Sequence, residues 1–571
     1  MKKFIVLLLS ILLSEVLLQN CANTRTPTGG PRDTIPPKLL LSIPEDQTIN
    51  FQGQEITLYF DEFIKADKLT QQLIITPNTD VKYKHIIKKR SITLKFDEPF
   101  QDSSTYTFNF FDGITDITEN NPAENLIIAL STGNYIDSLR VIGSVKELFT
   151  HKPIDKATVG LFKLSDSLDI VAQSPYYFIS TDKQGKFELK NLKAGKYRII
   201  SFSDENRNLK LDPATESYSF INDTIIPSSQ PDSLNLFQIK VNAAPLKFIS
   251  ARPSGLSFDV RYNKPIQDYT TLNKDSSIIS LSKLNADKDA ISFYNTSEII
   301  SDDSTRYIIT ARDSINNHIT DTVYVKFRKS SRKPEAFDYS VKPAKGSVLI
   351  NNHFNISFNK PVITYDSTFL SLELDTIVSI PLYPLDNKLN SNHTELSFRL
   401  PLTHQTYLDT LTKYRNTFHQ TDTLNIDSLK LIQYSILNRL SETAFTLKFK
   451  PNAFISVQND SSQELLSSYK YPVPENYGQI KLSLSTSEPS FLVEILNKSG
   501  NVYTTKWNCT TCAFQNVPPG EYFIRILIDN NQNGKWEVGN INELIEPEDV
   551  IIFSEKSILR ANWTLELKYS F

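Results

Sequence analysis

The chain has 571 residues, which is more than a single hydrophobic core organises, and its length alone predicts about three to five domains. The 61 Lys and Arg residues nearly balance the 64 Asp and Glu residues, so the formal net charge is −3. This balance excludes the basic field of a typical nucleic-acid-binding protein.

The N-terminal segment has the pattern of an export signal. Lys2 and Lys3 precede an apolar stretch from Phe4 to Leu13, which is too short to span a bilayer as a stable helix. Leu18 lies three residues before Cys21, and this arrangement resembles a lipoprotein signal peptide. The resemblance implies that Cys21 carries the lipid.

On this interpretation, residues 1–20 are the signal peptide and residues 21–36 form a flexible tether rich in Pro, Gly and Thr. Diacylation of Cys21 supplies the two chains that stable anchoring requires. Asn20 and Glu15 depart from the usual lipoprotein pattern. The alternative is an ordinary secretory signal followed by an unrelated cysteine.

Alternating apolar and polar residues dominate the rest of the chain. Short runs of this kind, separated by Asn, Asp, Pro and Gly, recur about every 8–12 residues and predict antiparallel β-sandwiches in tandem. Typical runs are "EITLYF", "RSITLKF", "LSFDVRY", "FNISF" and "AFTLKFK". We therefore expect an all-β chain.

One repeat is carried by "ITLYFDEFIKAD", "FDVRYNKPIQDY" and "ISFNKPVITYDS", in which Asp or Asn follows an aromatic residue. It resembles the bacterial Ig-like domain first described in surface-layer proteins. The resemblance implies Ig-like sandwiches at residues 37–134, 243–331 and 332–475. The last includes a segment near 402–440 with helical spacing, which we interpret as a helical insertion that either packs on its own sandwich or docks a partner.

A second repeat aligns "DKQGKFELKNLKAGKYRIISFSDENRNLKLDPATE" with "CTTCAFQNVPPGEYFIRILIDNNQNGKWEVGNINE". Gly195 and Gly520 each precede an alternating strand that ends in Asp204 or Asp529. The pattern resembles the transthyretin-like domains of carboxypeptidase regulatory segments, which implies such sandwiches at residues 137–242 and 476–571. Similar composite lipoproteins are typical of Bacteroidota.

The acidic segment after each of these strands places oxygen-bearing side chains at alternate positions, as calcium loops do. The candidate calcium ligands are Asp204, Asn206, Asn208, Asp212, Asp529, Asn531, Asn533 and Glu537. Gly534 suits the sharp turn at position six, whereas Leu209 would be strained there. Neither segment has a bidentate Glu at position twelve, although Glu216 and Glu543 follow closely. The alternative is that the Asn and Asp side chains cap their own backbone.

The fifth predicted domain also contains Cys509 and Cys512, separated by two residues. In an exported protein this spacing favours a disulfide across a tight turn. A redox pair would need a helix N-terminus, and a zinc site would need two more ligands. The three tryptophans, Trp507, Trp536 and Trp563, are candidates for packing or for glycan stacking; we expect Trp536 to pack into the sandwich.

No motif for enzymatic chemistry is present: there is no HExxH, no G-x-S-x-G and no phosphate-binding loop. We therefore expect a non-catalytic outer-membrane lipoprotein that is a scaffold or accessory subunit for β-barrels or other lipoproteins. The alternative is a cell-surface glycan-binding or adhesive lipoprotein. No acidic cluster follows Cys21, which favours the periplasmic face without deciding it.

Overall fold

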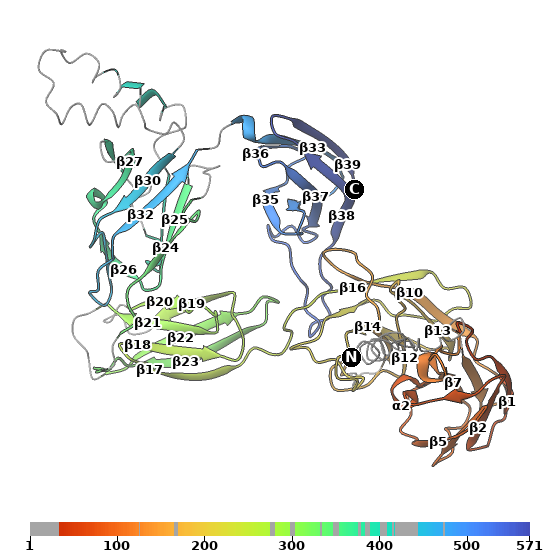
Figure 1. Cartoon of the computed structure of the whole chain (residues 1–571). Coiled ribbons are helices and arrows are strands. Elements are labelled where there is room, and N and C mark those ends of the chain that lie inside the picture. The colour runs from red at the N-terminus through yellow and green to blue at the C-terminus, as the bar shows by residue number, and fades with distance from the viewer. Residues whose placement is uncertain are drawn as a thin grey trace, which may run out of the picture.

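The computed structural model describes residues 33–571 except 125, 165–168, 274–279, 297–302, 332–333, 347–352, 375–377, 383–388, 400–407, 411, 414–415, 417–443 and 472–473. Cys21, the signal segment and most of the expected helical insertion lie outside these residues. The described residues 408–410 are helical. The chain is all-β, as the alternating pattern predicts, and its domains each pack two sheets around a core of their own (Figure 1).

The first domain has a core between a four-stranded and a three-stranded sheet. Its elements are β1 (Leu39–Ile43), β2 (Glu55–Phe60), β3 (Ile64–Lys65), α2 (Leu69–Gln72), β4 (Ile74–Thr76), β5 (Tyr83–Lys88), β6 (Ser91–Phe96), β7 (Thr105–Asn109), η1 (Phe111–Gly113), β8 (Thr115–Asp116) and β9 (Ile127–Ser131). The sheets run β1-β2-β6-β5 and β4-β7-β9, with β3 paired to β8. In β2 the residues Ile56, Leu58 and Phe60 are buried and their neighbours face outward, as the period of a strand requires.

The third domain repeats this strand order. Its elements are β17 (Phe248–Ser254), β18 (Ser257–Tyr262), β19 (Asp268–Asn273), β20 (Ser280–Leu284), β21 (Ala290–Asn295), β22 (Thr305–Arg312) and β23 (His318–Val325). The sheets run β17-β18-β21-β20 and β19-β22-β23.

The fourth domain is a variant of the same plan. Its elements are β24 (Tyr339–Lys342), β25 (His353–Phe358), β26 (Val362–Tyr365), η2 (Ser367–Phe369), β27 (Leu370–Leu374), β28 (Val378–Pro381), β29 (Glu395–Arg399), β30 (Ala444–Phe449), β31 (Phe454–Ser456) and β32 (Leu465–Lys470). The sheets run β24-β25-β29 and β28-β27-β30-β32, with β26 paired to β31. The segment with helical spacing connects β29 to β30.

One contact recurs in these three domains and explains the Asp or Asn of the repeat. The side chain accepts a hydrogen bond from the backbone N–H at the start of the first strand, and so fastens that strand to the end of the second. The pairs are Lys38 N–Asp61 Oδ1, Lys247 N–Asn263 Oδ1 and Asp338 N–Asn359 Oδ1, each 2.8 Å long.

The second and fifth domains share a different topology. The second contains β10 (Leu139–Glu147), β11 (Thr158–Lys163), β12 (Tyr177–Ser180), β13 (Lys186–Leu192), β14 (Tyr197–Phe202), β15 (Tyr218–Phe220) and β16 (Ser233–Gln238). The fifth contains η3 (Pro474–Asn476), β33 (Gly478–Ser485), β34 (Phe491–Asn497), β35 (Val502–Trp507), β36 (Thr511–Val517), β37 (Gly520–Ile528), β38 (Val550–Leu559) and β39 (Thr564–Ser570).

In each of these two domains the first strand lies at the centre of a three-stranded sheet and pairs in parallel with the last strand. The sheets are β13-β10-β16 and β12-β11-β14-β15 in the second domain, and β36-β33-β39 and β35-β34-β37-β38 in the fifth. The matched order places the two acidic segments at equivalent positions, between β14 and β15 and between β37 and β38.

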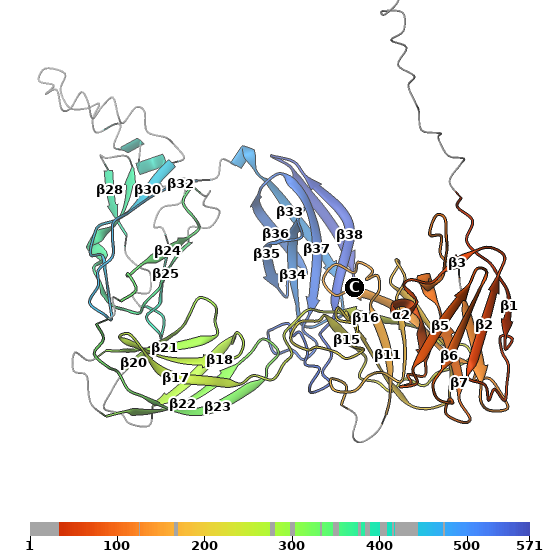
Figure 2. The ribbon, with the colours of Figure 1, turned by 60° about the horizontal axis from the view of Figure 1, so that its bottom comes forward.

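The chain does not run as an extended string. After the fourth domain it turns back, and the fifth domain lies beside the second (Figure 1, Figure 2). Direct contacts join the two: the Arg525 side chain donates to the Phe149 carbonyl over 3.3 Å, and the Asn222 backbone N–H donates to Glu546 over 2.8 Å. Among the described residues, no helix is long and apolar enough to cross a membrane.

Candidate functional site

The acidic segment of the second domain, residues 203–217, is held by its own side chains; we call it loop 1. The Asp204 carboxylate accepts hydrogen bonds from the backbone N–H groups of Asn208 and Leu209, both over 3.0 Å. Asn206 and Asn208 each accept from the backbone two residues further on, which are Asx-turns. Leu209 has a φ of 57°, the left-handed conformation expected to strain this position.

The equivalent segment of the fifth domain, residues 529–549, repeats these bonds; we call it loop 2. Asp529 accepts from the backbone N–H groups of Asn533 and Gly534, and Asn531 and Asn533 cap the turns that follow. Gly534 takes the left-handed conformation without strain, at a φ of 81°. In loop 2 the Ser490 hydroxyl also donates to Asp529, over 2.7 Å.

A glutamate near the C-terminal end of each loop accepts hydrogen bonds from the backbone of that loop. In loop 1 Glu216 accepts from the backbone of Glu205 and Asp212. In loop 2 the equivalent residue is Glu548, which accepts from the backbone of Asn531 and Glu537. The sequence offered Glu216 and Glu543 as substitutes for the missing calcium-binding Glu at position twelve. In loop 2 the acid that accepts from the loop backbone is Glu548, because loop 2 is longer than loop 1 and returns later to its sheet.

The electrostatics of loop 2 are dominated by buried acids. Burial tends to raise the pKa of Asp529, but the hydrogen bonds from Ser490, Gly534 and Asn533 outweigh it, so the pKa lies below its usual range. The pKa of Glu548 is raised by burial and by the nearby charges of Asp529 and Glu537. Loop 2 therefore gathers negative charge in a partly dehydrated place.

The two remaining candidate calcium ligands, Asp212 and Glu537, already accept hydrogen bonds from protein groups. Asp212 caps the turn that contains Ala214 and Thr215. Glu537 accepts from Asn531 in loop 2 and from Asn316 of the third domain. Within the residues that the structure describes, no three His, Cys, Asp or Glu side chains converge closely enough to hold a metal ion. A cation in either loop would have to draw on asparagine and backbone oxygens as well.

Loop 2 reaches beyond its own domain and covers the outer face of the four-stranded sheet in the second domain. Ile541, which is 1% exposed, belongs to the same buried cluster as Ile200 and Phe202, which are not part of the core of that domain. The left-handed Gly539 lets the loop turn here, because a Cβ would lie 2.4 Å from the Ile545 carbonyl. The buried cluster comprises Phe162, Ile200, Phe202, Leu211, Tyr218, Phe220, Ala243, Ile315 and Ile541, with Ile170, Val241, Val538 and Leu544 at its edge.

A second apolar cluster joins the two repeated domains along their sheets. Leu148 and Ile239 of the second domain bury against Leu527 and Val550 of the fifth. Beside them the Phe149 ring lies 5.2 Å from Trp536, and the Trp536 indole N–H donates to the Glu548 carbonyl. Trp536 thus packs between domains, where the sequence had placed it within its own sandwich.

An ion pair stiffens the fifth-domain side of this contact. Arg525 and Glu494 are 2.6 Å apart on adjacent strands and are 12% and 9% exposed. The same guanidinium stacks over the Phe149 ring, with its Cζ 4.9 Å from the ring centroid. Since a buried charge is costly without its partner, the pair fixes the position at which Phe149 docks.

The third domain takes part through the turn between β22 and β23. Asp313 in this turn pairs with the buried Lys264 over 2.5 Å, and Lys264 also donates to the carbonyls of Asn242 and Ala244 in the linker from the second domain. The turn then presents Ile315 to the apolar cluster. We call the whole contact between the fifth, second and third domains the junction.

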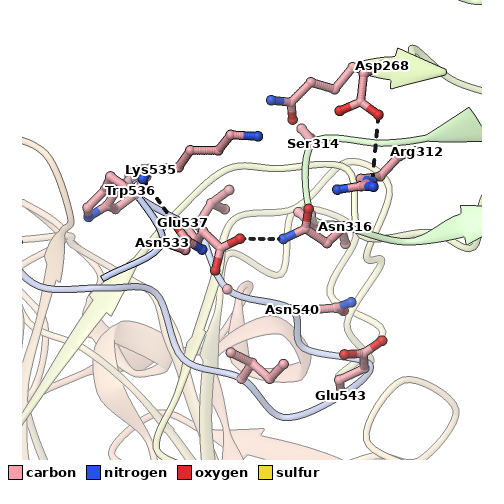
Figure 3. A pocket seen from close by; sticks show the side chains of 15 residues that line it. Asp268, Arg312, Ser314, Asn316, Asn533, Lys535, Trp536, Glu537, Asn540 and Glu543 are labelled. Atoms are coloured by element: carbon pink, nitrogen blue, oxygen red, sulfur yellow. Dashed lines mark hydrogen bonds and ion pairs between the residues drawn. The ribbon is translucent and has the colours of Figure 1, made fainter. Parts of the chain in front are cut away.

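Polar groups at the tip of loop 2 complete the junction. Asn540 donates to the side chain of Asn317 over 3.0 Å, and Asn542 donates to the Ala243 carbonyl over 2.9 Å. Between loop 2 and the third domain lies a cavity of about 250 Å³, lined by both polar and apolar residues and shown in Figure 3. Asp268 and Arg312 form an ion pair on one side of it, and Glu537 lies on the other.

The other predicted site residues lie away from the junction. Cys509 and Cys512 form a disulfide, with Cα atoms 5.6 Å apart; Cys509 lies between β35 and β36, and Cys512 lies in β36. Trp507 and Trp563 are 41% and 59% exposed, and Arg560 stacks on Trp563 with 5.0 Å between its Cζ and the ring centroid. The sequence contained one signal for the junction that was not used: "YRIISF" and "YFIRILI" are apolar on both faces.

Solved structures of other proteins align with this chain at low identity. Among solved structures, the N-terminal part of the bacterial S-layer protein SbsC aligns at 12% identity, over 34% of this chain and 44% of that one, with a TM-score of 0.14. Domains 1–6 of the S-layer protein SbsC align at 10% identity, over 92% and 68%, with a TM-score of 0.14. The Bacteroides ovatus mixed-linkage glucan utilization locus protein SGBP-B aligns at 12%, over 72% and 93%, with a TM-score of 0.17.

The chain thus spans 44% of the length of the first of these structures. A search among curated proteins finds no match. Residues 33–132 match the family model of the bacterial Ig-like domain, so the first domain of the chain is a bacterial Ig-like domain.

Proposed function

We propose that the protein is a non-catalytic outer-membrane lipoprotein, anchored through Cys21, that is a scaffold or accessory subunit of a complex containing β-barrel proteins or other lipoproteins. The junction is the observation that carries this proposal. Two buried apolar clusters hold the fifth domain against the second, and one of them includes Ile315 of the third, so these three domains have a set arrangement. Loops and outer sheet faces away from the junction are left to bind partners.

Affinity purification from detergent-solubilised membranes tests this function. We expect outer-membrane β-barrels or lipoproteins to co-purify with the tagged chain, and to be depleted when the junction is opened by a substitution in loop 2. An unrelated tagged lipoprotein is the control for adhesion to the resin. Recovery of the protein with no outer-membrane protein enriched over that control contradicts the proposal.

A second candidate function is glycan binding at the surface of the fifth domain. The exposed rings of Trp507 and Trp563 favour it, because aromatic faces stack on sugars. Trp536 is engaged in the junction and is a poorer platform. A glycan-array signal that is lost in Trp507→Ala or Trp563→Ala would support this alternative over the scaffold.

The lipid anchor makes a separate prediction. Cys21→Ser removes the only thiol that the N-terminal pattern offers for lipidation, so we expect the protein to move from the membrane pellet to the soluble fraction when the membranes are washed with high salt. A single myristoyl-sized chain already gives a membrane association constant of roughly 10⁴ M⁻¹, and two chains bind far more tightly. Fractionation followed by immunoblotting measures the change. Retention of the variant in the pellet, resistant to high salt, would show that Cys21 is not the anchor.

A further inference from the structure

The outer face of the first domain is both apolar and basic. This face belongs to the sheet β1-β2-β6-β5, and cross-strand pairing places its residues in rows. One row contains Leu41, Tyr59, Ser91 and Lys88, the next contains Ile43, Thr57, Thr93 and Ile86, and a third contains Glu55, Lys95 and Lys84. Leu41, Ile43, Tyr59 and Ile86 are 40% to 53% exposed.

Positive charge is concentrated along one edge of this face. The β5–β6 hairpin, from residue 82 to residue 95, contains six Lys or Arg and no Asp or Glu. In the described part of the chain, Lys95 pairs with Glu55, whereas Lys84, Lys88 and Lys89 form no ion pair. All three of these lysines are exposed. The face therefore combines exposed aliphatic side chains with lysines that form no ion pair within the described residues. This combination suits the headgroup region of an anionic bilayer.

The position of the hairpin in the chain favours the same partner. The Asp61 N–H donates to the Lys38 carbonyl, the Lys38 N–H donates to the Asp61 side chain, and the neighbouring Phe60 N–H donates to the Arg90 carbonyl in the hairpin turn. The hairpin turn therefore lies at the end of the domain where the chain enters it. Lys38 follows Cys21 by seventeen positions, a distance along the chain that spans at most about 60 Å when fully extended.

We propose that this face of the first domain, composed of Leu41, Ile43, Tyr59, Ile86, Lys84, Lys88 and Lys89, docks on an anionic phospholipid surface. The inference rests on the proposed lipid anchor for its geometry, because the anchor keeps the domain within reach of the bilayer. It adds a second, electrostatic attachment that orients the first domain, so that the sheet lies against the membrane and the later domains extend from it.

Binding to phospholipid vesicles tests the proposal on a chain that has no lipid anchor. The chain from residue 22 onward contains every described domain and no Cys21, so its binding reports the sheet face alone. We expect it to co-sediment with vesicles of phosphatidylglycerol and phosphatidylcholine in equal parts, and to remain in solution with phosphatidylcholine alone. Binding should weaken as salt is added, because the Debye length shortens from about 10 Å at 0.1 M to about 3 Å at 1 M.

The decisive variant is Lys84→Gln/Lys88→Gln/Lys89→Gln, which keeps the exposed aliphatic residues and removes three charges. We expect its partition onto the anionic vesicles to fall at least tenfold, since each basic residue near such a surface contributes about 1 kcal/mol. A matched control, Lys183→Gln/Lys186→Gln/Lys240→Gln, removes three exposed lysines of the second domain and should bind as the parent does.

Three outcomes overturn the proposal: no binding to anionic vesicles, equal binding to neutral ones, or an unchanged partition of the hairpin variant. A parent protein that binds only another protein, and not vesicles, also overturns it. The lipid anchor itself is tested separately, by the Cys21→Ser fractionation. The vesicle experiment does not depend on it, because the chain used there is not lipidated.

Discussion

Ile541→Asp is expected to release the fifth domain from the second while both remain folded. Ile541 is 1% exposed and lies in the apolar cluster beneath loop 2, away from the core of its own domain. An unpaired carboxylate there loses the burial of the isoleucine and must be dehydrated, at a cost of about 3–5 kcal/mol. The least costly relief is for the junction to open, which returns the carboxylate to water.

Small-angle scattering measures this opening as a larger radius of gyration, and limited proteolysis should show new cleavage within loop 2. Ile545→Asp is the matched control, because Ile545 is on the same loop but 52% exposed, so the same charge should leave the shape unchanged. If Ile541→Asp leaves scattering and proteolysis as in the parent, the junction is not what holds the fifth domain in place.

The local structure could be predicted from the sequence because it follows from local rules. Alternating runs such as "EITLYF" form strands with one buried face. The Asp or Asn of the first repeat accepts a hydrogen bond that joins the first strand to the end of the second. The left-handed conformation at Leu209 and Gly534 was anticipated from the turn alone. These features depend on residues that are near in sequence or that face a single core.

The junction could not be predicted in the same way, because it depends on which outer faces meet. "YRIISF" is apolar on both faces, which indicates that a second layer covers β14, but nothing in the run says that the cover is Ile541, more than three hundred residues later. The role of Glu548 was missed for a related reason. An ungapped alignment of the two loops hides the longer path of loop 2, and only the returning strand β38 shows which acid closes it.

The buried pair of Lys264 and Asp313 shows how such a contact is specified once the domains meet. Both side chains are 2% exposed, and Lys264 also binds two carbonyls of the linker between the second and third domains. The pair therefore orients the turn that contributes Ile315 to the junction. In the sequence "NKPI" reads only as the end of a strand, and the same lysine position is Glu62 in the first domain, which has no such linker.

Asp529→Ala is expected to lower the free energy of unfolding of the fifth domain by about 3 kcal/mol in the absence of metal. The Asp529 side chain is buried and accepts from Ser490, Asn533 and Gly534. Its loss leaves the Ser490 hydroxyl and the Gly534 N–H without this acceptor, whereas the Asn533 N–H keeps its bond to Asn531. Because the pKa of Asp529 lies below its usual range, this stabilisation is present at neutral pH and is lost only as the pH falls through that lowered pKa. Thermal or urea unfolding measures the difference.

The equivalent change in loop 1, Asp204→Ala, is the matched control. Asp204 is partly exposed and accepts two backbone bonds, from Asn208 and Leu209, so we expect a smaller loss. Equal losses in the two variants would show that the burial of Asp529 and its bond to Ser490 contribute nothing to stability.

Calcium binding to loop 2 can be tested with the same unfolding measurement. If the oxygens of Asp529, Asn531 and Asn533 hold Ca²⁺ with a Kd of about 10⁻⁴ to 10⁻³ M, then 10 mM calcium stabilises the domain by roughly 1.4–2.7 kcal/mol and raises its Tm. Burial raises the pKa of Glu548, and repulsion from Asp529 and Glu537 raises it further; a cation there would offset that repulsion. Asp529→Ala should abolish the rise in Tm, and magnesium should not reproduce it. A Tm that is unchanged in millimolar calcium would leave both loops as turns capped by their own asparagines and aspartates.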